Sequence, residues 1–320
     1  MGRILDSGIE DGDVCDHNTA RFISAVDIAA ALPPGSARVC IKITALCPIA
    51  LLEKTSDLLR WQKKHPSFKL PWKTHLFLIL SDSSPLHLTT SEPPALTAEE
   101  ERELQLAHER LLALCALCVE HGTPLLVDVE YVMVQPAIDY FTFVGAMAFN
   151  DAGAADSERP IVHGTIQAYL HDMRDRLEAM VRGVERERMQ LGLKVVRGTY
   201  LTRETRLMAA LGVPSPIHGQ LGAARAQELG IPKGDRNLQF TQLMGMADGL
   251  SLSLRNAGFQ VSDYLPYGPV EQIIPYLIRR AKENKGLLST SSFDRHLLRY
   301  GRPSGIYLLQ DTPIDVNCVI

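Results

Sequence analysis

The sequence lacks the features that mark secreted, membrane-spanning and nucleic-acid-binding proteins. Six cysteines in 320 residues are too few for a disulfide scaffold. The formal net charge of -4 argues against nucleic acid as the main partner. The apolar runs are short and interrupted, so no membrane span is expected. The first residues match neither a signal peptide nor an Arg- and Ser-rich transit peptide, and we expect the chain to begin inside folded structure.

A metal-binding pattern is missing as well. Cys115 and Cys118 form a CxxC, but they lie in an apolar helical run and no second pair follows at zinc spacing. We interpret them as buried packing residues and expect no metal site. With 46% hydrophobic residues, the chain can bury one large core or two small ones.

What the sequence does contain is an alternation of short apolar runs with amphipathic ones. The runs that predict strands are 3–6, 39–46, 125–130, a segment within 160–170, 193–200, 238–246 and 261–266. The runs that predict helices are 18–32, 97–120, 135–149, 172–189, 202–211, 221–229 and the stretch after Gly268-Pro269. The first long helix opens on a capping box, Thr97 to Glu100. Residues 63–96 are rich in Pro, Ser and Thr and predict a surface insertion.

Strands alternating with helices predict a (β/α) barrel, an α/β fold whose site lies at the carboxyl ends of the strands. About seven strands are expected where such a barrel has eight, and the missing one leaves two strand edges unpaired. Polar side chains gather near these strand ends, namely Lys42, Asp128, Gln167, Lys194, Arg197 and Tyr264. Each alone has a structural explanation, but six on one rim favour a site. Lys42 interrupts an apolar strand, so it should face the site or pair with a carboxylate.

The stretch from Tyr264 to Asn284 predicts a strand end, a turn and a helix. Tyr276, Arg279, Arg280 and Glu283 fall on one helical face, while Ile274, Leu277, Ile278 and Ala281 are expected to pack inward. A tyrosine and two adjacent arginines suit a small carboxylate, since a guanidinium binds it through two hydrogen bonds. From spacing alone, a solvated basic helix end explains the pattern equally well.

Six motifs, in this order, resemble the proline dehydrogenase family, and most closely its plant and algal members. They are Lys42 to Leu46, Val127 to Glu130, Thr165 to Leu170, Lys194 to Tyr200, Gln242 to Met246, and Tyr264 to Asn284. The resemblance runs from about Arg3 to about Leu298 and implies a flavoenzyme on a (β/α)8 TIM barrel. The absence of a GxGxxG agrees with it, because this family holds FAD on a barrel and not on a Rossmann fold.

The resemblance implies a substrate site for L-proline. Lys42, Arg279 and Arg280 would bind the carboxylate, and Asp128 would support the pocket by balancing the cations. Tyr264 and Tyr276 would close over the pyrrolidine ring against Leu243. Relatives that act on hydroxyproline tend to carry a smaller residue in place of Tyr264, so the resemblance favours proline.

It also implies a set of FAD contacts. Gln167, Lys194 and the backbone from Val196 through Arg197 to Gly198 and on to Tyr200 would hold the flavin. Lys194 would lie near the ring edge that accepts the hydride, and a cation there stabilises the reduced flavin. Gly198 lets a strand end approach the cofactor closely. Glu283 would reach the ribose side.

The implied reaction is the oxidation of L-proline to Δ1-pyrroline-5-carboxylate, the first step of proline catabolism, with electrons passed to a quinone. A mitochondrial location and peripheral association with the inner membrane are family expectations, since no targeting segment is visible.

The chain departs from the family pattern in three places. The strand expected after Lys194, which in the family ends in a His-Asn pair, is missing, because His218-Gly-Gln runs directly into Leu221-Gly-Ala-Ala. Residues 300–320 read as a divergent tail after a barrel domain of 1–299. The N-terminal arm of the family is absent. The second hypothesis is therefore a catalytically inactive, truncated or splice variant of the same enzyme. A weaker third is another flavin barrel, of the methylenetetrahydrofolate reductase type, which would use a nicotinamide donor.

Overall fold

The computed structural model describes residues 11–73, 91–151, 159–167, 170, 173–196, 232, 235, 238–244, 248–283 and 316–319. The chain divides into two compact units. Residues 1–26 and 40–219 form the first unit, and residues 27–39 and 220–320 form the second. The predicted strand at 3–6 and the predicted helices at 202–211 and 221–229 lie outside the described residues.

Four strands begin the structure. They are β1 (Ala37–Ile41), β2 (Leu125–Val127), β3 (Val162–Gln167) and β4 (Gly192–Val196), in the spatial order β4-β3-β2-β1. β2 and β3 pair in parallel, as do β3 and β4. Beyond the end of β2, the amide of Asp128 donates to the carbonyl of Ile41 at 2.9 Å, which continues the contact with β1. The residues that follow these strands therefore meet at one edge of the sheet.

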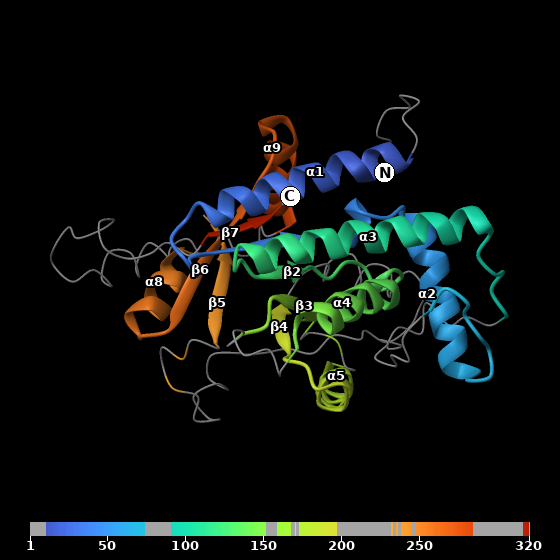
Figure 1. Cartoon of the computed structure of the whole chain (residues 1–320). Helices are drawn as coiled ribbons and strands as arrows, with labels where there is room; N and C mark the ends of the chain where they lie inside the picture. Colours follow the sequence, from blue (N-terminus) through green and yellow to red (C-terminus); the bar gives the residue numbers. More distant parts are fainter. Residues whose placement is uncertain are drawn as a thin grey trace, which may run out of the picture. The chain divides into compact units, whose positions relative to one another are not determined.

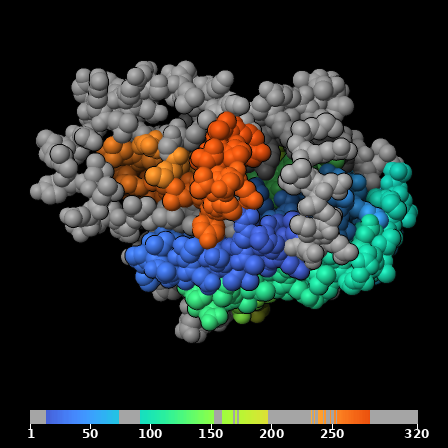
Figure 2. All heavy atoms as spheres, turned by 90° about the horizontal axis from the view of Figure 1, so that it is seen from above, coloured from blue at the N-terminus to red at the C-terminus, as the bar shows by residue number. Residues whose placement is uncertain are grey.

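The helices of this part are α1 (Asp11–Ala30), α2 (Ile49–Lys64), α3 (Ala98–Glu120), α4 (Gln135–Phe149) and α5 (Met173–Glu187). α4 packs on β3 and against both α2 and α3 (Figure 1). Its Tyr140 and Phe141 are buried with Leu111 and Leu114 of α3. Figure 2 shows α1 and α3 side by side, and an ion pair of 2.7 Å between Asp16 and Arg110 joins them.

The ends of α3 follow from local sequence chemistry. Thr97 and Glu100 form the predicted capping box, each bonding the other's backbone amide. The helix ends at Glu120, and Gly122 follows with φ +60°, a conformation that glycine adopts without strain. Cys115 and Cys118 are buried free thiols, which confirms their interpretation as packing residues.

The second unit holds β5 (Gln239–Leu243), β6 (Gln260–Pro266) and β7 (Val316–Val319), in the order β7-β6-β5 with parallel pairing. α8 (Asp248–Asn256) packs on β5 and β6, and α9 (Val270–Glu283) follows β6 after Gly268 and Pro269. Neither α8 nor β7 was predicted. The alternating Leu and Ser residues of α8 do not show a helical period, and β7 lies in the segment expected to be a divergent tail.

Two predicted strands end earlier than expected. The strand predicted over 39–46 stops at Ile41, because Ile43–Ala45 turn into a 3-10 helix, η1, that starts directly after Lys42. The strand predicted over 125–130 stops at Val127, which leaves Asp128 and Glu130 in the segment beyond the strand. Both changes place the polar residues after the strand end, where side chains need not alternate across the sheet.

Among the described strands, β4 has a neighbour only on its β3 side, and β5 only on its β6 side. The sequence between β4 and β5 is the segment from which a strand was predicted to be missing. The described part of the chain contains seven strands, of which β7 was not predicted, while the strand predicted at 3–6 lies outside the described residues.

Candidate active site

Asp128 lies between two lysines from neighbouring strands. Its Oδ2 accepts a hydrogen bond from Lys42 Nζ, and its Oδ1 accepts one from Lys194 Nζ, both at 3.1 Å. Asp128 is 8% exposed, while the lysine side chains are 25% and 19% exposed. The prediction that Lys42 pairs with a carboxylate and that Asp128 balances cations is confirmed.

The electrostatics of this cluster favour the charged forms. Burial by itself would raise the pKa of Asp128, but the attraction of Lys42 and Lys194 and their hydrogen bonds outweigh it and lower the pKa to about 2. Burial likewise opposes the charge on Lys194, yet the attraction and the hydrogen bond of Asp128 help to raise its pKa. Within the cluster of Lys42, Asp128 and Lys194, two ammonium groups and one carboxylate sum to one net positive charge, which suits an anionic ligand.

Cys40 contacts the same cluster. Its Sγ lies 3.7 Å from Lys194 Nζ, and burial raises the pKa of the thiol to about 11. The thiol is therefore protonated at neutral pH and acts as a weak hydrogen-bonding and packing group.

A second contact joins the ends of β1 and β2 two residues further along. The amide of Thr44 donates to Glu130 Oε1 at 3.1 Å, and its hydroxyl donates to Oε2 at 2.7 Å. Gln167 at the end of β3 is fully buried, and its Nε2 lies 3.4 Å from the carbonyl of Glu130. The sequence analysis quoted Glu130 only as part of a motif. Its spacing of two from Asp128, like that of Thr44 from Lys42, was the signal that could have identified this pair.

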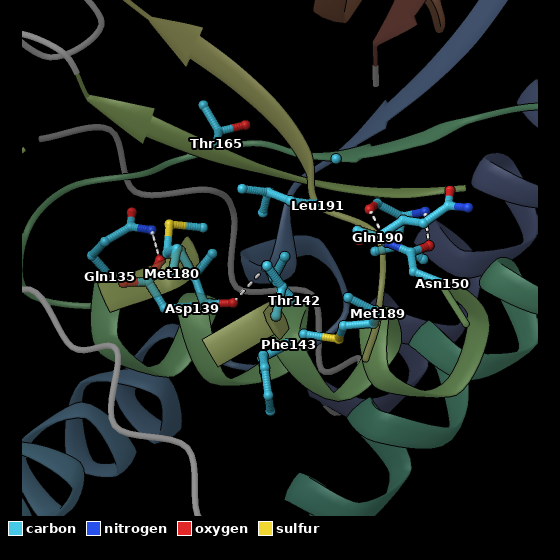
Figure 3. Close-up of a pocket in the computed structure, with 16 residues that line it drawn as sticks. Gln135, Asp139, Thr142, Phe143, Asn150, Thr165, Met180, Met189, Gln190 and Leu191 are labelled. Atoms are coloured by element: carbon cyan, nitrogen blue, oxygen red, sulfur yellow. Dashed lines mark hydrogen bonds between the residues drawn. The ribbon is translucent and has the colours of Figure 1, made fainter. Parts of the chain in front are cut away.

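A cavity of ≈ 40 Å³ lies elsewhere in the first unit (Figure 3). Residues of α4, β3, α5 and β4 line it, with Met180, Phe143 and Met189 giving it an apolar wall. None of Lys42, Asp128, Gln167 and Lys194 lines it. We interpret this cavity as a packing gap between helices and sheet, separate from the candidate site.

The second unit carries the other predicted substrate groups. Leu243 and Tyr264 are register partners on β5 and β6, so they lie next to each other at the strand ends. On α9 the guanidinium carbon of Arg279 lies 5.8 Å from the ring centroid of Tyr276, and that of Arg280 lies 5.3 Å from it. The prediction that these three share one helical side is confirmed.

The prediction that four apolar residues of α9 pack inward is wrong for two of them. Ile274 and Ile278 are 48% and 50% exposed, and with Val270 they form an exposed apolar stripe. The helical period identified a second face, but it could not tell whether other elements cover that face.

Several predicted FAD contacts fall outside the description. Val196 is the last residue of β4, while Arg197, Gly198 and Tyr200 lie beyond the described residues. Glu283 is the last residue of α9, and nothing is described of its side chain. Within the described chain, no group of three His, Cys, Asp or Glu residues is placed to hold a metal ion. No described helix has both the length and the apolar character needed to cross a membrane.

The proline dehydrogenase family profile matches residues 40–223 and 219–295. This range includes all the predicted substrate and cofactor residues, from Lys42 to Glu283. The chain belongs to the proline dehydrogenase family. Two mitochondrial proline dehydrogenases of Arabidopsis thaliana are 46% and 43% identical to it. They align over 91% and 92% of this chain and 68% and 67% of their own lengths. The human mitochondrial enzyme is 31% identical, so the expected likeness to plant members is confirmed.

Solved structures of proline utilization A proteins show the same fold at low sequence identity. A bifunctional member gives a TM-score of 0.59 at 17% identity, over 93% of this chain and 29% of the other. The Bdellovibrio bacteriovorus protein gives 0.57 at 17% identity, over 88% and 29%. The predicted fold class, a barrel of the proline dehydrogenase type, is confirmed, and the seven strands of the described residues are consistent with an incomplete barrel.

The family match is itself divided. Its two segments meet at residues 219–223, the place where the sequence predicts a lost strand. The alignment with the first Arabidopsis protein runs over 329 positions although it covers 91% of a 320-residue chain, so this relative has residues that the chain lacks.

Proposed function

We propose that the chain is an FAD-dependent proline dehydrogenase, which oxidises L-proline to Δ1-pyrroline-5-carboxylate in the first step of proline catabolism. The observation that supports this most directly is the buried cluster of Lys42, Asp128 and Lys194. Its single net positive charge suits an anionic group, and the strand ends are where barrel enzymes bind substrate.

The substrate groups divide into a carboxylate site and a ring site. Lys42, Arg279 and Arg280 bind the carboxylate, because charge-assisted hydrogen bonds orient it and fix the ring. Asp128 holds Lys42 in place through their hydrogen bond of 3.1 Å. Tyr264, Tyr276 and Leu243 enclose the pyrrolidine ring and exclude water. Tyr264 also favours proline over hydroxyproline.

The residues present fit FAD. Lys194 and Gln167 offer an ammonium and a buried amide at the ends of neighbouring strands, and flavin oxygens and nitrogens accept such hydrogen bonds. FAD held there would supply the acceptor for the hydride that leaves the ring carbon beside the proline nitrogen. The positive charge of Lys194 favours the electron-rich reduced state. Val196, Arg197, Gly198, Tyr200 and Glu283 complete the cofactor contacts in this proposal.

In this proposal the electrons are passed to a quinone. The enzyme meets the quinone by peripheral association with the mitochondrial inner membrane. The relatives from Arabidopsis thaliana and Homo sapiens carry the word mitochondrial in their names, and this supports the location. Bovine and human relatives named hydroxyproline dehydrogenase are 29% identical, well below the Arabidopsis proline dehydrogenases.

A second candidate is an inactive variant of the same enzyme. The divided family match at 219–223 favours it, and so does the outermost position of β4 among the described strands. Val195 on β4 is 61% exposed, which leaves an apolar side chain uncovered at that edge. Exposed strand edges promote aggregation and low stability.

Purification with FAD present separates the candidates. An active enzyme elutes with a flavin absorbance band that L-proline bleaches without oxygen and that NADH leaves unchanged. Loss of the response in Lys42→Met, with the flavin band retained, assigns the effect to the substrate site. A colourless chain that takes up no FAD contradicts the proposal and supports the inactive variant. A cooperative thermal transition raised by FAD contradicts the inactive variant.

A further inference from the structure

We infer that Glu130 is a positioning residue for Lys42, acting through Thr44. This inference rests on the proposed role of Lys42 in binding the substrate carboxylate. Lys42 and Thr44 flank Ile43 at the end of β1, and Asp128 and Glu130 flank Val129 after β2. The two pairs form successive contacts between the same two segments, Lys42 with Asp128 and Thr44 with Glu130.

The contact between Thr44 and Glu130 fixes both backbone and side chain. Each carboxylate oxygen accepts one hydrogen bond, from the Thr44 amide at 3.1 Å and from the hydroxyl at 2.7 Å. Thr44 is the middle residue of η1, which begins directly after Lys42. A two-point contact therefore sets the direction in which the chain leaves Lys42. Glu130 is only 4% exposed, so few water molecules can replace these bonds.

The backbone of Glu130 is itself fixed by a hydrogen bond to α4. Its amide donates to Gln135 Oε1 at 3.1 Å, and Gln135 Nε2 donates to Asp139 Oδ1 at 2.7 Å, a bond drawn in Figure 3. Arg176 of α5 donates to the other oxygen of Asp139 at 3.0 Å. The backbone of Glu130 is thus anchored to α4 and, through Asp139, to α5, and this fixes the position from which its carboxylate accepts hydrogen bonds from Thr44.

The outer side of η1 is held by different groups. Asn18 donates to the carbonyl of Ala45 at 3.1 Å, and Arg110 donates to the carbonyl of Leu46 at 3.1 Å. These bonds fix the exit of the turn. Only the bonds to Glu130 fix its middle residue, within the described contacts of η1, and these lie on the side of the Lys42 and Asp128 pair. Loss of the Thr44 hydroxyl should therefore shift Lys42 without unfolding the turn.

Thr44→Val tests the inference with a change of nearly equal volume. We expect the KM for proline to rise by roughly five- to tenfold, while kcat changes by less than about twofold, since binding geometry and not hydride transfer is disturbed. Thr44→Ser keeps the hydroxyl and should stay within about twofold of wild type in both constants. Thr142→Val is the matched control, because its hydroxyl bonds only the carbonyl of Ile138 within α4, at 2.8 Å.

A second readout does not depend on turnover. Reductive ¹³C-methylation labels lysine amines, and the Lys42 signal is assigned by its absence in Lys42→Arg. We expect this signal to move in Thr44→Val and in Glu130→Gln, and to stay in place in Thr142→Val. If the wild type fails to oxidise proline, the proposed function fails, while the signal still tests the positioning. If the wild type is active and Thr44→Val equals Thr142→Val in KM and in the Lys42 signal, the positioning role is wrong.

Discussion

Lys42 Nζ lies 3.1 Å from Asp128 Oδ2 in a buried pair that the sequence places 86 residues apart. Asp128 has a pKa of about 2 in the folded protein, below its ordinary value of 3.8. Its stabilising contribution is therefore complete above about pH 4 and is lost as the pH falls through about 2. We expect the free energy of unfolding of the wild type to fall by about 2 kcal/mol more over this range than that of Asp128→Asn.

Denaturant unfolding at pH values between 4 and 2 measures this difference. Asp128→Asn should also be less stable at pH 7, because it leaves two partly buried lysines without their carboxylate. The control is Glu99→Gln, whose side chain is 73% exposed and pairs with Arg102 at the surface. It should keep the acid dependence of the wild type. Equal slopes for Asp128→Asn and wild type would show that Asp128 is not held ionised.

Arg176 and Asp139 form the second buried ion pair with a testable consequence. Their side chains are 4% and 13% exposed, and their contact is 3.0 Å. Nε and Nη1 of Arg176 find no hydrogen-bond acceptor in the structure as described. Arg176→Met removes the guanidinium that donates to Asp139 Oδ2 and should cost about 3 kcal/mol of unfolding free energy. Adding Asp139→Leu should recover at least half of this loss, because an apolar pair needs no desolvation of charge.

Thermal or denaturant unfolding of the single and double variants checks the pair. The matched control is Arg174→Met, two residues earlier on α5, where the side chain is 86% exposed and its ion pair with Glu178 lies at the surface. It should change stability by less than about 0.5 kcal/mol. A double variant as unstable as the sum of the two single changes would contradict the prediction.

Much of the first unit could be predicted from sequence because local patterns determine it. The helix over 135–149 was predicted with its observed bounds, and the capping box at Thr97 marked the start of α3. The pairing of Lys42 with a carboxylate followed from the cost of burying a lysine alone. These inferences need only residue type, spacing and burial.

The remaining features depend on contacts between distant segments. Nothing in the spacing of Thr44 shows that its hydroxyl reaches Glu130, 86 residues away. Whether Ile274 and Ile278 are covered depends on what packs on α9, and a helical period carries no such information. β7 pairs with β6 across more than 40 residues, and its sequence, Val-Asn-Cys-Val, is too short to stand out as a strand.

Two glycines should respond to alanine in opposite directions. At Gly192 on β4 a Cβ would lie 2.7 Å from the ring of His163 and 2.8 Å from the carbonyl of Val162, so β3 and β4 would have to separate. We expect Gly192→Ala to lower the free energy of unfolding by about 1–3 kcal/mol. At Gly145 in α4 the nearest atom is Cys115 Sγ at 3.4 Å, an ordinary contact.

Gly145→Ala should therefore stabilise the protein by up to about 1 kcal/mol, because alanine loses less backbone entropy than glycine in a helix. Each variant is the control for the other, since both add one methyl group to a glycine in regular secondary structure. Melting temperatures measured side by side give the signs directly. Destabilisation by both variants would mean that the space beside Gly145 is smaller than its 3.4 Å contact indicates.

The proposed carboxylate site on α9 is tested most sharply by a substitution that keeps the positive charge of an arginine and removes its planar guanidinium. The guanidinium carbons of Arg279 and Arg280 lie 5.8 and 5.3 Å from the ring centroid of Tyr276, so both guanidinium groups contact one aromatic ring. Lysine keeps the positive charge but loses the planar fork that can make two hydrogen bonds to one carboxylate. We expect Arg280→Lys to raise the KM for proline by about tenfold, with a smaller effect on kcat.

The control is Arg255→Lys on α8, in the same unit. Arg255 is 41% exposed, and its contact with Asp263 is 3.9 Å, so a lysine should serve equally well there. Steady-state kinetics over a range of proline concentrations, at fixed flavin loading, give KM and kcat separately. If Arg280→Lys and Arg255→Lys both keep the wild-type KM, the fork does not bind the substrate, and α9 presents a solvated basic end as the spacing alone allowed. A rise in KM confined to Arg280→Lys assigns carboxylate recognition to this helix. Both substitutions keep the positive charge and remove a planar guanidinium, so the difference reflects what the guanidinium binds at position 280.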